Sequence, residues 1–111
     1  MVSASTVSAL IAEYGKHGWV LRRALLIKPN VDDETSSLLA GAERIASDID
    51  ALWFSRSSRP DRETWELRRL RGTPYAIDAF LDDSMDAETR EEILSNVEDR
   101  MRESRTFFSG N

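Results

Sequence analysis

Hydrophobic side chains recur at helical spacing in three segments of the chain. The first segment, residues 4–14, carries Val7, Leu10, Ile11 and Tyr14. The second segment, residues 33–49, carries Leu38, Leu39, Ala42, Ile45, Ala46 and Ile49. The third segment, residues 87–102, carries Ile93, Leu94, Val97 and Met101 and follows Asp86, the expected N-cap. Apolar positions with a period near 3.6 residues indicate amphipathic helices, so we predict a helix in each segment.

The segments between these helices read as strands. The run "WVLRRALLI", residues 19–27, is short and apolar, and residues 51–70 contain two runs around a polar Ser/Arg/Pro/Asp loop. The stretch "GTPYAIDAFLDD", residues 72–83, alternates in part after a turn signal. We predict an α+β fold, a small antiparallel sheet of three to four strands covered on one face by an N-terminal and a C-terminal helix. The alternative is an all-α bundle, in which Pro60 begins a helix, because Ala, Leu, Arg and Glu are abundant.

The phrase Trp-x-Leu-Arg-Arg occurs twice, in "GWVLRRALL" at residues 18–26 and in "TWELRRLRG" at residues 64–72. Because side chains alternate along a strand, each copy places its Trp, its Leu and its second Arg on one face and its first Arg on the other. Trp53 and Arg56, in a shorter third copy, fall on opposite faces. We interpret the tryptophans as core side chains of the sheet and the arginines as partners of the chain's own carboxylates.

Composition narrows the class of protein. The chain has 111 residues and no cysteine, and its formal net charge is −5. This length fits a single domain, residues 1–111, and the missing thiols exclude disulfides and thiolate metal sites. The first residues do not follow a signal-peptide pattern, and no apolar stretch approaches the ~20 residues that span a bilayer. We therefore expect a cytoplasmic protein that does not enter a membrane.

Charge is distributed unevenly along the chain. Basic side chains outnumber acidic ones in residues 1–30 and 51–75, and the reverse holds in residues 31–50 and 76–111. Both Trp-x-Leu-Arg-Arg phrases lie in the basic segments. The negative total disfavours binding to a phosphate backbone, so we expect the basic and acidic segments to neutralise each other within the fold.

Candidate catalytic and metal-binding chemistry is sparse. His17, the only histidine, lies in a turn between two glycines, where we expect an exposed side chain. The acidic residues between Asp78 and Glu92 lack the spacing of a calcium loop and are expected to form a loop and the first turn of a helix. The usual nucleophile, phosphate-loop and zinc-helix motifs are missing. We therefore predict no catalytic residue, no metal and no cofactor, and an enzyme with a carboxylate-based site is a disfavoured alternative.

These observations favour a small acidic protein-interaction or regulatory module that binds another protein or itself as a homodimer. The candidate interaction surface consists of Trp53, Arg56, Arg68, Phe107 and Phe108. The alternative is single-stranded nucleic-acid binding through Trp19, Trp53, Trp65 and their arginines, with the rings stacked on bases. The order of elements and the acidic charge are loosely similar to those of small secretion chaperones and related adaptor proteins, at the level of the fold and without a shared residue motif.

Overall fold

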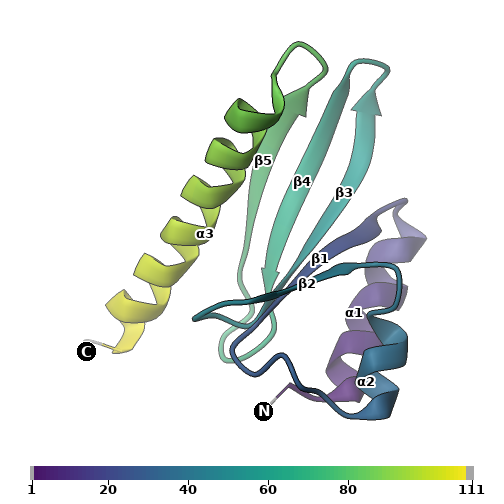
Figure 1. Ribbon diagram of the computed structural model, residues 1–111, viewed down its shortest axis with the longest axis vertical. Coiled ribbons are helices and arrows are strands. Elements are labelled where there is room, and N and C mark those ends of the chain that lie inside the picture. Colours follow the sequence, from purple (N-terminus) through teal and green to yellow (C-terminus); the bar gives the residue numbers. More distant parts are fainter. Residues whose placement is uncertain (1, 110–111) are drawn as a thin grey trace.

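The computed structural model describes residues 2–109, with side chains up to residue 104 (Figure 1). In chain order the elements are α1 (Ala4–Lys16), β1 (Val20–Leu26), α2 (Asp33–Leu38), β2 (Glu43–Ala46), β3 (Ala51–Arg59), β4 (Arg62–Arg69), β5 (Ala76–Asp82) and α3 (Ala87–Ser109). The predicted α+β class is confirmed and the all-α alternative is wrong. The sheet has five strands, where the sequence indicated three or four.

The sheet is mixed, with the strand order β2-β1-β3-β4-β5. The short β2 runs parallel to β1, and every other neighbouring pair is antiparallel. A tight turn joins β3 to β4 and the loop of residues 70–75 joins β4 to β5, whereas the parallel pair needs the longer connection that contains α2. β5 and β2 are therefore the two edge strands among the described residues.

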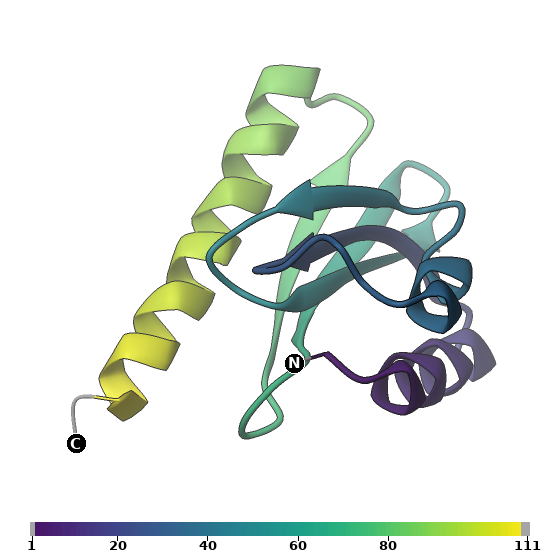
Figure 2. The same cartoon turned by 60° about the horizontal axis from the view of Figure 1, so that its bottom comes forward.

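Helices cover both faces of the sheet (Figures 1 and 2). On the α1 face, Val7 of α1 packs in a cluster with Leu52 and Phe54 of β3, and Leu39, the C-cap residue of α2, completes this cluster. On the α3 face, Leu94, Val97 and Met101 of α3 pack in a second cluster on β1, β3, β4 and β5. The two terminal helices thus lie on opposite faces, whereas the sequence analysis placed both on one face. Both faces of the sheet carry large apolar side chains, so each face needs a helix packed on it to exclude water.

The helix predicted for residues 33–49 is wrong beyond its first turns. α2 begins at Asp33 after its cap Asp32, but the chain turns after Leu39 and enters β2. Gly41 has a φ of +93°, a left-handed conformation that ends a helix and that only glycine adopts readily. The apolar positions that fitted a helix instead reach both clusters, because Leu39 joins one and Ile45 of β2 packs against the other.

The two Trp-x-Leu-Arg-Arg phrases form strands, as predicted, but only one alternates regularly. In β4, Trp65 and Leu67 face α3. In β1 the register against β3 shifts between Leu21 and Arg23, which is a β-bulge. Leu21 therefore packs on the α1 face while Arg23 bonds to α3 on the other, which corrects the expectation that they share a face.

Candidate functional site

Two of the three tryptophans form the centre of the core. Trp53 is fully buried and Trp65 is 5% exposed, and their rings meet edge to face with centroids 6.0 Å apart. The indole Nε1 of Trp53 donates to Glu98 Oε2 of α3 at 2.9 Å, which satisfies its one polar atom. Trp19 is partly buried on the other face, against Tyr14. A base cannot stack on Trp53 or Trp65 in this fold, because both rings are packed under α3.

The predicted interaction residues do not form one surface. Trp53 lies in the core under α3, whereas Arg56 and Arg68 lie on the strands' other side, opposite Thr64 and Leu52 in register. The Arg56 guanidinium donates to the backbone oxygen of His17 at 3.1 Å and lies 4.6 Å from the Trp19 ring centroid. The exposed turn position expected for His17 is observed.

The remaining two predicted interaction residues, Phe107 and Phe108, fall in the last turn of α3. Their side chains lie outside the described part of the chain. The role predicted for Phe107 and Phe108 therefore stays a prediction.

Acidic residues of the chain pair with many of its arginines, as the charge segregation predicted. Arg23 bonds Glu91 of α3 at 2.7 Å and approaches Glu43 of β2 at 3.4 Å, so it ties three elements together. Arg90 of α3 likewise bonds Glu63 of β4 at 2.7 Å. These pairs span the sheet and α3, and they show that much of the charge is complementary within the molecule.

The outer edge of β5 is open, since no strand pairs with it among the described residues. Arg69 N donates to Tyr75 O, and Asp83 N donates to Asp61 O, at the two ends of the β4–β5 ladder. Because backbone groups alternate in an antiparallel pair, the N–H and C=O of residues 76, 78, 80 and 82 point away from β4. Phe80, in the middle of this edge, is 62% exposed.

A half-buried polar cluster lies between α1 and the sheet. Tyr14 of α1 donates its hydroxyl to Glu66 Oε2 of β4, and Glu66 stands opposite Asp78 of β5 in register. Burial and the neighbouring Asp78 carboxylate raise the pKa of Glu66 to about 7. Burial and the same bond to Glu66 raise the pKa of Tyr14. The sequence analysis missed this cluster, because residues 14, 66 and 78 meet only through the tertiary fold.

A groove of about 630 Å³ lies near the start of β1. Its lining includes Arg22, Arg56, Ser55, Ser57 and Glu63. Within residues 2–104 no group of three or more His, Asp or Glu side chains is arranged to hold a metal ion. No helix in the described part of the chain is long and apolar enough to cross a membrane.

Comparison with protein-family models, with curated proteins and with solved structures finds no match to this chain. Function must therefore be argued from the residues and their geometry.

Proposed function

We propose that the chain is a small cytoplasmic protein-interaction module whose partner is a second copy of itself, joined by antiparallel pairing of the two β5 edges. The observation that carries the proposal is the open edge of β5 with Phe80 exposed at its middle. An edge strand presents unpaired backbone donors and acceptors, and a second strand satisfies them. Many edge strands carry lysine, proline or a bulge, which discourage pairing, and β5, "AIDAFLD", has none of these. The charged side chains of β5 are Asp78 and Asp82.

Charge selects one register for this pairing. If Ala79 stands opposite its counterpart, Asp78 of each copy faces Phe80 of the other, and Ala76 faces Asp82. The neighbouring registers, in which the pairing shifts by two residues, set Asp78 opposite either Asp78 or Asp82 of the second copy. Directly opposed like charges destabilise a strand pair, so the first register is favoured.

The same register gives Phe80 an apolar neighbour. The two Phe80 side chains become diagonal neighbours on one face of the continuous sheet, a separation that aromatic rings can bridge. Pairing therefore buries the most exposed of the large hydrophobic side chains identified on the described surface. A strand pair buries less than the ~1,200 Å² of a standard interface, so we expect a dissociation constant in roughly the micromolar range.

Sedimentation equilibrium over a wide range of protein concentration tests the proposal. The chain is expected to dimerise, and Phe80→Asp is expected to remain monomeric because it sets a carboxylate directly opposite Asp78 of the second copy. Val20→Asp is the matched control, because Val20 is 59% exposed on β1, away from β5, and should leave the dimer intact. A monomer at every concentration, or a dimer equally weakened by both variants, would overturn self-pairing through β5.

A further inference from the structure

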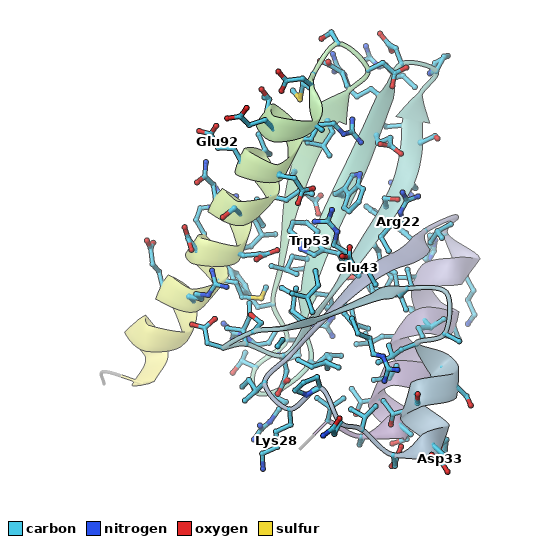
Figure 3. All side chains as sticks on the ribbon, in the orientation of Figure 1. Arg22, Lys28, Asp33, Glu43, Trp53 and Glu92 are labelled. Atoms are coloured by element: carbon cyan, nitrogen blue, oxygen red, sulfur yellow. The ribbon has the colours of Figure 1, made fainter. Side chains whose placement is uncertain are left out.

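The groove near the start of β1 is a second surface feature with its own chemistry. Its floor is made by short side chains of β3, Ser55 and Ser57, on the α3 face of the sheet. Longer side chains, Arg22 of β1 and Glu63 of β4, rise on its two sides. At about 630 Å³ the hollow has the size of a small-molecule site. Figure 3 places Arg22 near the start of β1, beside β3.

The bulge in β1 supplies the groove with a positive charge. It turns Arg22 and Arg23 to the same indole, with guanidinium carbons 5.3 Å and 5.6 Å from the Trp65 ring centroid. Arg23 forms ion pairs with Glu91 and Glu43. Among the described residues Arg22 makes no ion-pair contact, although its charge helps to lower the pKa of Glu63. The Trp65 ring holds the Arg22 guanidinium beside the groove, where an anion can reach it.

Ser55 supplies a hydroxyl to the floor of the groove. It is 3% exposed and lines the groove. A serine hydroxyl both donates and accepts, so it can bond to a polar group that enters the hollow. Ser57, two residues along β3, presents another hydroxyl on the same side.

The one carboxylate in the lining is already neutralised. Glu63 accepts from Arg90 at 2.7 Å, and the indole nitrogen of Trp65 lies 3.5 Å from the same oxygen. Arg56 adds a second guanidinium at the rim, fixed by the backbone oxygen of His17. The lining therefore has an excess of positive charge in a chain whose formal net charge is −5.

We propose that this groove binds the phosphate group of a small phosphorylated molecule, with Arg22 and Ser55 as its principal donors. A phosphate offers oxygens in several directions, which suits a planar guanidinium on one side and hydroxyl groups on the floor. The volume leaves room for an organic portion beside the phosphate. This site is distinct from β5 and does not depend on self-pairing.

Titration of the full chain with inorganic phosphate and with phosphoserine, followed by the backbone and indole N–H signals in NMR, tests the site. We expect saturable shifts centred on Ser55 and on the Trp65 indole, with a dissociation constant in roughly the millimolar range for inorganic phosphate. Tighter binding of phosphoserine would show that the organic portion contributes, and equal binding would assign recognition to the phosphate alone. Chloride at matched ionic strength should produce no such shifts.

Variants distinguish a built site from diffuse attraction. Arg22→Gln should weaken phosphate binding about tenfold, and Ser55→Ala about threefold, because each removes a donor. Arg44→Gln, which removes an exposed arginine of β2 outside the groove, and Phe80→Asp should leave binding unchanged. The proposal would be overturned if phosphate shifted N–H signals over the whole surface. It would also be overturned if a folded Arg22→Gln variant bound phosphate as tightly as the parent chain. Neither result would affect the β5 proposal.

Discussion

Tyr14 of α1 donates its hydroxyl to Glu66 of β4, so the first helix is attached to the sheet through a carboxyl group. Glu66 is also the register partner of Asp78 on β5. Two acidic side chains side by side in a half-buried place do not ionise equally, and one of them retains a proton to higher pH. This relationship makes the packing of α1 sensitive to pH.

The first prediction concerns the free energy of unfolding between pH 4.5 and pH 7. Burial and the Asp78 carboxylate raise the pKa of Glu66 from 4.5 to about 7 in the folded chain. In this window the unfolded chain has lost the proton that the folded chain still binds, so stability falls as pH rises. Because Glu66 is only half buried and solvent screens it, we expect a loss on the order of 1 kcal/mol.

Urea denaturation at several pH values measures this effect. Glu66→Gln should remove most of the decline, since glutamine stays neutral throughout. Glu92→Gln is the control, because Glu92 is an exposed carboxylate of α3. If the Glu66→Gln variant lost stability with rising pH as steeply as the parent chain, the assignment of this titration to Glu66 would be wrong.

The second prediction compares two tryptophans. Trp53→Ala should cost about 3–5 kcal/mol of unfolding free energy, because Trp53 is fully buried among side chains that cannot close the cavity. Trp19→Ala should cost clearly less, since Trp19 is only partly buried on the α1 face. Chemical denaturation of both variants measures the difference, and equal costs would contradict the central place of Trp53 in the core.

The third prediction separates two neighbouring arginines. Arg23→Gln should lower the unfolding free energy by about 1 kcal/mol, because Arg23 holds Glu91 and Glu43 and is only 19% exposed at its side chain. Arg22→Gln should change it by less than about 0.5 kcal/mol, because Arg22 is exposed and has no carboxylate partner among the described residues. Thermal or urea denaturation of the pair tests this, and a larger loss from Arg22→Gln would reverse the assignment.

The sequence predicted those elements whose local hydrophobic pattern matches the face that they bury in the fold. The last helix begins after Asp86, whose side chain accepts from Thr89 N at 2.8 Å, as its cap position indicated. The strand phrase at Trp65 alternates as expected, because both faces of β4 have distinct neighbours. The core role of Trp53 followed from the cost of exposing large rings in so short a chain.

The rest depended on tertiary pairing. Residues 43–46 become a strand only because β1 offers them a parallel partner, and tertiary context overrides a helical pattern of Ala and Ile. The bulge at Arg22 has no local signature in an alternating run. It nevertheless determines that Arg22 lines the groove while Arg23 pairs with Glu91. The cluster of Tyr14, Glu66 and Asp78 has no sequence signal, because its members are far apart along the chain.

The central claim is that β5 is an interaction edge, and a proline substitution tests it most directly. The N–H of Phe80 points away from β4, so Phe80→Pro removes a donor at the open edge without removing a bond of the β4–β5 ladder. Sedimentation equilibrium, with circular dichroism as a check of the fold, should show a dimer for the parent chain and a folded monomer for Phe80→Pro. A folded Phe80→Pro chain that dimerises as strongly as the parent, or a parent chain that never dimerises, would contradict the account.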